Sequence, residues 1–456
     1  MFQKTIKNKI KFTGKGLHTG VVNNITLLPS DVNTGIRFQR IDVQGQPYIY
    51  ASIENVANTN RRTLLQQNGI SVETVEHLLA AIFASSINNL IIQIDGTEVP
   101  ILDGSAKIFI EKIENTGILE QNELKKQFSI THYFKVENRA DNSKIEFYPN
   151  PKLEIEVNID YNSSILSSQK AKLNSLLKFK KHIASARTFC FLHELIHLMK
   201  KNLIKGGDLD NSVIFIESDT HRDDLGELSR FLPKEMKKLK KGVLNNKKMI
   251  YENEQAKHKL LDLIGDISLL GFDIRGKIIA HKPGHKINTM FTKKLKEEIL
   301  KSKNLMRGKP LMNLQDIKNI LPHREPFLLI DEIRELETNY VTGIKYVNID
   351  EYYFKGHFPG APVMPGVLQI EAMAQTGGIL ALNSVEDPEN YLTYFMKIDK
   401  VKFKQKVEPN CTLIFKLQLL SPIRRGICHM EGKAYVNNEV VTEAELMAKI
   451  VKEKNE

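Results

Sequence analysis

The sequence of 456 residues has no tryptophan, only three cysteines and no long apolar run. Cys190, Cys411 and Cys428 are odd in number and widely spaced, which excludes a disulfide framework and a Cys-x-x-Cys metal pair. The longest apolar runs, such as residues 78–84, are far shorter than the roughly 20 residues that cross a bilayer. No apolar segment follows the charged N-terminus as it would in a secretion signal. We therefore expect a cytoplasmic protein in a reducing compartment.

The composition is that of a folded globular protein, with 41% hydrophobic and 26% charged residues. At about 150 residues per domain, the length predicts roughly three globular units. The net charge of +11 is unevenly distributed. Residues 309–456 carry 18 Lys and Arg against 20 Asp and Glu, whereas residues 1–308 carry 47 against 34. A basic surface favours an anionic partner, although it can also be merely solvated. No recognised nucleic-acid-binding motif accompanies the charge, so we expect no nucleic acid partner.

The chain divides near residue 300. Residues 292–309 are rich in charge and run into Gly-Lys-Pro at 308–310, which predicts a helix followed by a linker over 301–310. Residues 311–333 then restart as a short amphipathic helix, a turn and an apolar strand. Before the linker, short β-rich runs precede a helix twice, around residues 74–85 and 258–270. This order predicts an α+β protein with two related α/β sandwich halves, 1–130 and 131–300, followed by a third domain, 311–456.

Two helices carry the first group of chemically active side chains. Glu76 and His77 stand together near the start of one predicted helix. On the other, His258 and Asp262 are four residues apart and share one face, which Asp266 continues. If the helices converge, His77, His258 and Asp262 could hold a zinc ion and leave its fourth position open, as catalytic sites do. A hydrogen-bonded polar pair is the alternative for each residue taken alone.

A competing metal motif, H-E-x-x-H, occupies residues 193–197 and is typical of zinc peptidases. The extended form of that motif needs glycine and histidine where this chain has Lys200 and Leu203. Glu217 could supply a third ligand, but it follows an apolar run that reads as a strand rather than the second helix required. A zinc peptidase remains the alternative function.

Seven blocks of residues 1–300 occur in the order of a known enzyme family: GKGLHTG (14–20), TVEHLLAA (74–81), EVPILDGSA (98–106), ARTFCFLHE (186–194), GGDLDN (206–211), HKLLDLIGD (258–266) and HKPGHKINT (281–289). Together they closely resemble the zinc-dependent UDP-3-O-acyl-N-acetylglucosamine deacetylase of lipid A biosynthesis. The resemblance implies hydrolysis of the acetamide of UDP-3-O-(3-hydroxyacyl)-N-acetylglucosamine, with one Zn²⁺ per site held by His77, His258 and Asp262.

The same resemblance assigns roles to further residues. It implies that Glu76 takes a proton from the attacking water, and that His285, oriented by Asp266, stabilises charge and protonates the leaving amine. Thr188 matches the family's oxyanion donor, and Lys259 matches its cation near the substrate diphosphate.

Two expectations concern the substrate and the membrane. His18 lies where a loop that contacts the sugar nucleotide is expected. The lysine-rich stretch 219–248 suggests peripheral contact with anionic membrane lipids.

A second constellation lies in residues 354–375. Its prolines and glycines predict an irregular loop from His357 to Gly366, followed by a helix over 367–374 that carries Glu371 in mainly apolar surroundings. Alternating apolar segments at 332–348, 401–407, 411–420, 429–438 and 440–451 predict an antiparallel sheet wrapped around this helix, which is the hot-dog architecture.

Two blocks in this region, LPHREPFLLIDEI (321–333) and GHFPGAPVMPGVLQIEAMAQ (356–375), resemble the 3-hydroxyacyl-[acyl-carrier-protein] dehydratase of fatty acid synthesis. The resemblance covers residues 309–456. It implies that His357 removes the α proton of (3R)-3-hydroxyacyl-[acyl-carrier-protein] and that Glu371 helps the hydroxyl leave as water, giving the trans-2-enoyl product without a cofactor. The N–H groups at Gly366 would polarise the thioester. In this family His and Glu of one site come from different subunits, so we expect at least a dimer.

Acyl carrier protein is acidic, so its docking needs local positive charge. Lys400, Lys402, Lys404 and Lys406 alternate along a predicted strand and would share one face, with 424–425 nearby. We expect Lys402 and Lys404 to contact the carrier, and a solvated strand is the alternative. The whole chain is thus predicted to be a deacetylase fused to a dehydratase.

Overall fold

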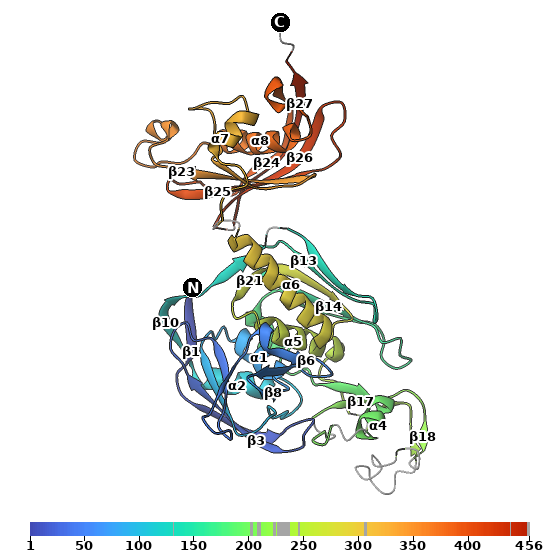
Figure 1. The fold of residues 1–456 in the computed structure, drawn as a ribbon. Helices are drawn as coiled ribbons and strands as arrows, with labels where there is room; N and C mark the ends of the chain where they lie inside the picture. The colour runs from blue at the N-terminus through green and yellow to red at the C-terminus, as the bar shows by residue number, and fades with distance from the viewer. Residues whose placement is uncertain are drawn as a thin grey trace. The chain divides into compact units, whose positions relative to one another are not determined.

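A computed structural model describes residues 1–130, 132–200, 204–207, 211–221, 225, 238–244, 247–304, 308–437 and 439–453. The chain forms two compact units, Met1–Ile299 and Leu300–Glu456 (Figure 1). The predicted linker, 301–310, includes residues 305–307, which lie outside the described residues. The predicted boundary near residue 130 and the linker stay predictions.

The first unit contains two five-stranded sheets of the same design. In each, the last strand along the chain lies between the second and third, antiparallel to the second and parallel to the third. An additional short strand, β11 (Gln127–Ser129), pairs with β21. The first sheet has the order β2 (Ile10–Lys15), β3 (Val22–Pro29), β9 (Leu90–Ile94), β4 (Ile36–Arg40), β5 (Tyr48–Tyr50); the second has β12 (Phe134–Asn138), β13 (Ser143–Tyr148), β21 (Asp273–His281), β14 (Leu153–Ile159), β15 (Gln169–Leu173).

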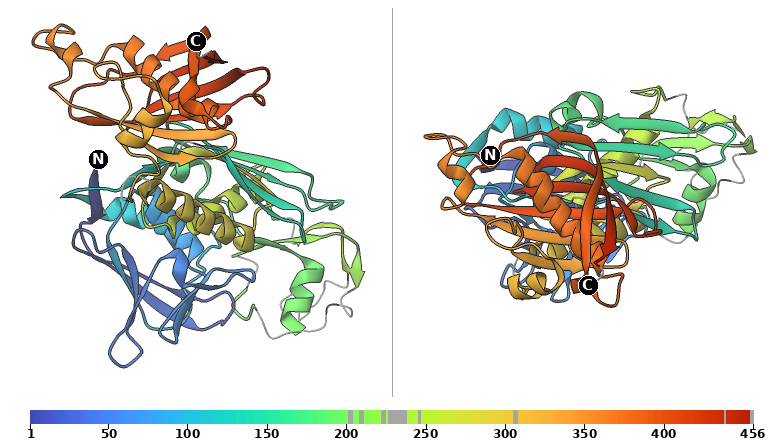
Figure 2. Two further views of the ribbon diagram at one scale, coloured as in Figure 1. Left: turned by 45° about the horizontal axis from the view of Figure 1, so that its top comes forward. Right: turned by 90° about the horizontal axis from the view of Figure 1, so that it is seen from above.

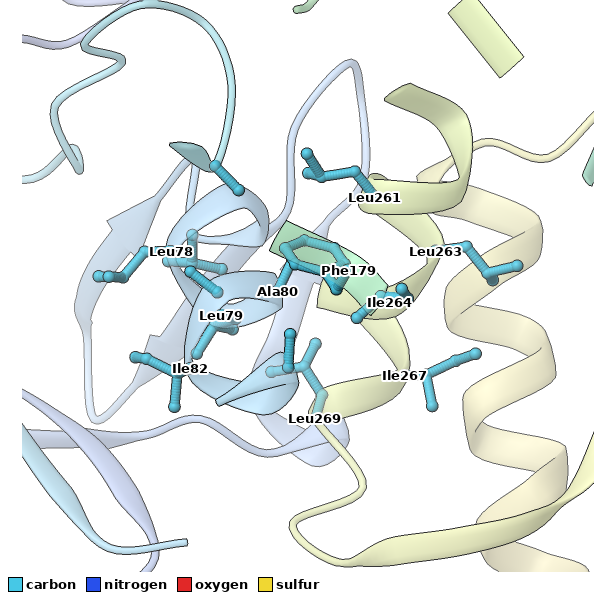
Figure 3. Packing of buried hydrophobic residues seen from close by; sticks show 14 of the residues in the cluster. Leu78, Leu79, Ala80, Ile82, Phe179, Leu261, Leu263, Ile264, Ile267 and Leu269 are labelled. Atoms are coloured by element: carbon cyan, nitrogen blue, oxygen red, sulfur yellow. The ribbon is translucent and has the colours of Figure 1, made fainter. Parts of the chain in front are cut away.

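Four helices of the first unit lie between these sheets, as Figure 2 (left) shows for α1 and α6. Helix α2 packs on β2, α5 packs on β14 and β15, and α1 contacts both α2 and α5. Buried side chains of α1 and α5 meet around Phe179 (Figure 3). Their close crossing requires Gly265, because a Cβ there would lie 2.2 Å from the backbone oxygen of Glu76. The four helices are α1 (Glu76–Ala84), α2 (Lys107–Thr116), α5 (Glu254–Ser268) and α6 (His285–Asn304).

Smaller elements complete the first unit. Strands β6 and β7 form a hairpin, and Thr63 at the end of its connecting loop, residues 59–63, contacts Glu76 of α1. Helix α4 follows strand β16 of a small sheet, and the next strand of that sheet, β17, is a strand as predicted. The bounds are β1 (Phe2–Ile6), β10 (Ile118–Leu124), β6 (Val56–Asn58), β7 (Leu64–Gln67), β8 (Ile70–Glu73), α3 (Phe179–His182), β16 (Phe189–Phe191), α4 (Leu192–Lys200), β17 (Val213–Ile216), β18 (Thr220–His221), β19 (Lys238–Leu239) and β20 (Gly242–Val243).

The second unit is one six-stranded antiparallel sheet with helix α8 packed against it. Twelve of the 17 residues of α8 are buried, which suits a helix that is apolar on most sides. Asn313 caps α7 by accepting hydrogen bonds from the first turn. The sheet order is β22 (Glu332–Leu336), β23 (Tyr340–Val347), β25 (Cys411–Leu419), β26 (Ile427–Val436), β27 (Glu439–Lys452), β24 (Tyr391–Phe403); the helices are α7 (Leu314–Ile320) and α8 (Gly366–Leu382).

The mixed helices and sheets confirm the α+β class, but one strand was predicted wrongly. We expected a strand over 401–407, whereas β24 begins ten residues earlier and ends at Phe403. A bulge between Asp399 and Lys402 interrupts the alternation, and Lys400 has a left-handed φ of 49°. Lys400, Lys402, Lys404 and Lys406 therefore do not share one strand face, because a bulge shifts the side chains that follow it.

No helix in the described part of the chain combines the length and the apolar character needed to span a membrane. Most of the lysine-rich stretch 219–248, on which the expected membrane contact rests, lies outside the described residues, as do residues 208–210 of the GGDLDN block.

Candidate active sites

Helices α1 and α5 bring His77, His258 and Asp262 together. Nitrogen and oxygen atoms of the three side chains lie within 4.8 Å of one another, and all three residues are buried. Asp262 Oδ1 is 3.5 Å from His77 Nε2 and 3.4 Å from His258 Nε2. In the described part of the chain, this is the only group of three or more His, Cys, Asp or Glu with such spacing. It consists of the three residues that the sequence analysis selected.

The chemistry of this cluster fits a zinc ion. Asp262 Oδ1 is buried and has no hydrogen-bond partner among the described residues. The carbonyl oxygen of Ala186 lies 3.0 Å from His258 Nδ1 and can accept its proton, which leaves Nε2 as the ligand atom. Burial lowers the pKa of His258 to about 4, so the imidazole is neutral as a metal ligand must be. Two nitrogen donors and one carboxylate oxygen are ligands that zinc prefers in catalytic sites.

Lys259 lies against the cluster. Its Nζ is 2.9 Å from Asp262 Oδ2 and 5.6 Å from the centre of the Phe189 ring. Burial disfavours the charge of Asp262, but the neighbouring His258 and Lys259 hold its pKa well below the usual value. The lysine predicted to meet the diphosphate therefore touches a candidate ligand in this structure.

A second buried group, Glu76, Asp266 and His285, adjoins the candidate ligands. His285 Nδ1 lies 2.9 Å from Asp266 Oδ2, and Nε2 lies 3.7 Å from Glu76 Oε1. Burial would lower the pKa of His285, but Asp266 and Glu76 raise it to about 9. Burial raises the pKa of Glu76, against the opposing effect of His285. The group thus combines an imidazole that is protonated at neutral pH with a carboxylate, as an acid and a base require.

Two residues that contact this group were not found from the sequence. Thr63 donates its hydroxyl proton to Asp266 Oδ1 at 2.6 Å, and Asn288 donates to Asp266 Oδ2 at 2.8 Å. Both are fully buried. Thr63 lies 203 residues from Asp266 in the chain, so no local pattern could have indicated the contact.

Thr188 and His18 lie outside the helices that carry these two groups. Thr188 is half-buried, its backbone N–H donates to Gly104 at 2.8 Å, and it follows Ala186 by two residues. His18 is buried, with both ring nitrogens lacking a hydrogen-bond partner in the described structure. Burial lowers its pKa to about 4 despite Glu98, whose carboxylate accepts the backbone N–H of His18 at 2.9 Å. Glu98, also missed from the sequence, holds the GLHTG loop in place.

The H-E-x-x-H motif does not form a metal cluster in the described residues. His193 and His197 are exposed on α4, and Glu194 pairs with Arg61 at 3.0 Å. His193 Nδ1 does lie 3.4 Å from Glu217 Oε2, but both are on the surface side of the helix and strand, and no third donor joins them. The described residues therefore do not form the alternative zinc site at this motif.

In the second unit, Glu371 lines a cavity of about 280 Å³ whose wall is mainly apolar. Gln375 Nε2 donates to Glu371 Oε1 at 3.0 Å, and His323 Nε2 lies 3.6 Å from the same oxygen. Neither partner was singled out from the sequence, although His323 belongs to the LPHREPF block. Tyr394 and Phe395 of strand β24 form another part of the wall.

His357 belongs to the irregular loop before α8. Its Nδ1 is 2.7 Å from the Val363 carbonyl oxygen, which accepts the Nδ1 proton and leaves Nε2 able to take a proton. Among the described residues, His357 is not part of the wall of the cavity that Glu371 lines. Gly366 is the first residue of α8, where backbone N–H groups lack partners within the helix.

The predicted carrier-docking lysines are exposed but paired. Lys402 lies 3.3 Å and Lys404 2.5 Å from the carboxylate of Glu443 on strand β27. Exposed pairs of this kind are weak, so both lysines could exchange partners.

Comparisons with known proteins relate each of the two units to an enzyme family. A family model described as UDP-3-O-acyl N-acetylglycosamine deacetylase, LpxC, matches residues 3–226 and 237–297, and a FabA-like domain matches residues 321–445. A "Bifunctional enzyme LpxC/FabZ" from Porphyromonas gingivalis is 44% identical, and one from Bacteroides thetaiotaomicron is 45% identical; each alignment covers 99% of both chains.

A single-activity relative matches the first unit. The "UDP-3-O-acyl-N-acetylglucosamine deacetylase" of Saccharophagus degradans is 38% identical over 289 residues, covering 63% of this chain and 87% of the relative. The chain belongs to the family of bifunctional LpxC/FabZ enzymes, in which an LpxC deacetylase is followed by a FabZ dehydratase.

Proposed function

We propose that the first unit hydrolyses the acetamide of UDP-3-O-(3-hydroxyacyl)-N-acetylglucosamine and that the second dehydrates (3R)-3-hydroxyacyl-[acyl-carrier-protein]. The observation that carries the first activity is the convergence of His77, His258 and Asp262. These residues would hold Zn²⁺, which when bound supplies a Lewis acid for amide hydrolysis. The two activities are linked by a common precursor, because the dehydratase substrate is also the source of the acyl chain on the deacetylase substrate.

The remaining residues of the first site divide the proton transfers between them. Glu76 takes a proton from the attacking water, for which its raised pKa makes it a better base than an exposed carboxylate. His285 is protonated at neutral pH, stabilises negative charge on the reacting carbonyl and gives its proton to the leaving amine. Asp266 fixes the ring by accepting the Nδ1 proton. Thr188 offers a hydroxyl to the same developing charge.

Two residues are proposed to bind substrate in the first unit. Lys259 contacts the diphosphate, exchanging part of its pairing with Asp262 for a phosphate oxygen. His18 offers its unpartnered ring nitrogens to the sugar nucleotide. Its burial supports this role, because a buried polar group without a partner is costly unless a ligand satisfies it.

Metal analysis together with a deacetylase assay tests this assignment. Wild type should bind one Zn²⁺ per chain, whereas His258→Ala should lose both zinc and deacetylase activity. His193→Ala is the matched control, since its exposed imidazole belongs to the competing motif, and it should keep both. Loss of zinc from His193→Ala with retention by His258→Ala would reverse the assignment.

For the second unit we propose a hot-dog domain in which His357 removes the α proton and Glu371 protonates the departing hydroxyl. The N–H groups at Gly366 polarise the thioester carbonyl. No cofactor is required, because the α proton is acidified by the thioester itself. The apolar cavity beside Glu371 suits an acyl chain.

We also propose that two copies pair through strand β24 to complete this site. Strand β24 is at the edge of the described sheet and exposes a row of apolar side chains, an arrangement that favours pairing with another strand. The cavity reaches this edge through Tyr394 and Phe395, and His357 lies elsewhere in its own chain. The exposed residues are Tyr394, Phe395, Met396, Ile398, Val401 and Phe403.

Several broader assignments belong to the same proposal. The matching strand orders of the two sheets support two related α/β sandwich halves. Acyl carrier protein docks near Lys402 and Lys404, and the enzyme works in the cytoplasm. Peripheral contact with anionic lipids would bring the first site close to its amphiphilic substrate; co-sedimentation with anionic vesicles should then weaken with added salt.

A further inference from the structure

The loop between strands β6 and β7 delivers a fully buried hydroxyl into the first site. Thr63 ends this loop and has no exposed surface. The two residues before Thr63 form ion pairs with other elements. Arg62 pairs with Glu73 on β8, and Arg61 pairs with Glu194 on α4 at 3.0 Å. Arg61 adopts a left-handed φ of 60°, so the chain turns sharply just before Thr63.

Thr63 contacts all three members of the acid–base group. Its backbone N–H donates to Glu76 Oε2 at 3.2 Å, and its hydroxyl donates to Asp266 Oδ1 at 2.6 Å. The hydroxyl oxygen also lies 3.3 Å from His285 Nδ1. A hydroxyl has one proton to give and can accept in return, so these contacts are compatible with one another. Thr63 is therefore the point at which the base and the His285–Asp266 pair are connected.

We infer that Thr63 is a positioning residue for the deacetylase, acting through Asp266 and His285. The inference rests on the proposed deacetylase function. By binding one carboxylate oxygen of Asp266, the hydroxyl turns the other oxygen toward His285. The more buried of the two ion pairs, Arg62 with Glu73, holds the loop in place and so keeps His285 aligned with Glu76. Because this alignment matters in the reaction rather than in substrate binding, Thr63 governs kcat and leaves KM nearly unchanged.

The test uses substitutions at Thr63 in the full-length, zinc-loaded enzyme. Thr63→Val keeps the shape and removes the hydroxyl, and should lower the deacetylase kcat by about 10- to 100-fold, as expected for a hydrogen bond to a charged group. KM should stay within about twofold and the zinc content should be unchanged. Thr63→Ser retains the hydroxyl and should restore kcat to within about threefold of wild type.

Thr5→Val is the matched control. Thr5 is also buried, on β1, but its hydroxyl accepts the backbone N–H of Ser30 at 3.2 Å rather than bonding to a catalytic residue. It undergoes the same chemical change and should alter kcat by less than about twofold. A loss equal to that of Thr63→Val would show that kcat is lowered by the loss of any buried hydroxyl in the first unit, and would overturn the inference.

A double substitution separates positioning from general stability. If Thr63 acts through His285, adding Thr63→Val to His285→Ala should cause no further loss of kcat. A purely structural effect would multiply with the loss from His285→Ala, and would overturn the inference, as would wild-type kcat in Thr63→Val. If Thr63→Val does not fold, Thr63→Ala provides the same comparison. An undiminished kcat in His285→Ala itself would instead contradict the proposed function.

Discussion

The two units build their sites in different ways. In the first, six charged or ionisable side chains from α1, α5 and the start of α6 are buried and in contact within one chain. In the second, Glu371 lines a cavity that reaches an exposed sheet edge. His357 is not one of the described residues that line this cavity. A site on the helices of a closed core can be complete in one subunit, whereas we propose that the site beside the exposed strand is completed by a neighbouring subunit.

The largest expected effect separates the two units by complementation. Glu371→Gln and His357→Ala should each lower dehydratase activity by about 10²- to 10⁴-fold, because each removes a proton-transfer group. Neither should change the deacetylase. When the two variants are co-expressed and form mixed dimers, one of the two sites in each mixed dimer regains both residues.

With random pairing, mixed dimers make up about half of the population, so about a quarter of wild-type dehydratase activity should return. Activity of the purified co-expressed protein, compared with each variant alone, provides the measurement. If differently tagged chains show that mixed dimers form but no activity returns, both residues of a site lie in one subunit, and the proposed sharing of the site between subunits is wrong.

The helix crossing of the first unit should be intolerant of a single methyl group. Gly265→Ala would bring a Cβ to 2.2 Å from the Glu76 oxygen, forcing α1 and α5 apart. We expect a loss of about 3 kcal/mol or more in the free energy of unfolding, together with weaker zinc binding. Denaturant unfolding and zinc titration measure both. Gly284→Ala, where no described atom lies within 4 Å of the added Cβ, is the control.

The pH dependence of the deacetylase should report the buried His285. Its pKa is raised to about 9, so the protonated form predominates below that pH and is lost above it. Activity should therefore hold through neutrality and fall as pH rises through about 9. Asp266→Asn removes a charge that raises this pKa and should move the fall to lower pH. An alkaline limb at the same pH in Asp266→Asn would show that it belongs to another group.

The smallest expected effect concerns the carrier. Lys402→Glu with Lys404→Glu should raise the dehydratase KM for the carrier-bound substrate by about two- to fivefold at low salt, and less at high salt, because exposed charges act mainly on encounter. Lys11→Glu, an exposed substitution in the first unit, should have no effect on this KM. An unchanged KM in the double variant would remove Lys402 and Lys404 from the docking surface.

Different parts of the molecule were predictable to different degrees. The His258–Asp262 spacing and the apolar face of α1 are local patterns that indicate candidate ligands, but the family resemblance was needed to join the two helices in one site. Strand β24 was misplaced because its apolar residues are exposed and a bulge breaks their alternation near Lys400. The spacing of four residues on one helix could have linked Gln375 to Glu371, whereas His323 comes from a distant loop that no local spacing indicates.

The sequence by itself determined the chemical identities and local periods: which helices carry imidazole and carboxylate, where the irregular loop before α8 lies, and where the charge falls. Tertiary structure alone decided that Thr63 meets Asp266, that Glu98 holds the loop of His18, and that the histidines of α4 join no metal cluster among the described residues. The physical reason is that helix and strand periods act over a few residues. Contacts between residues hundreds of positions apart depend on how closely two helices or loops can pack, as Gly265 illustrates.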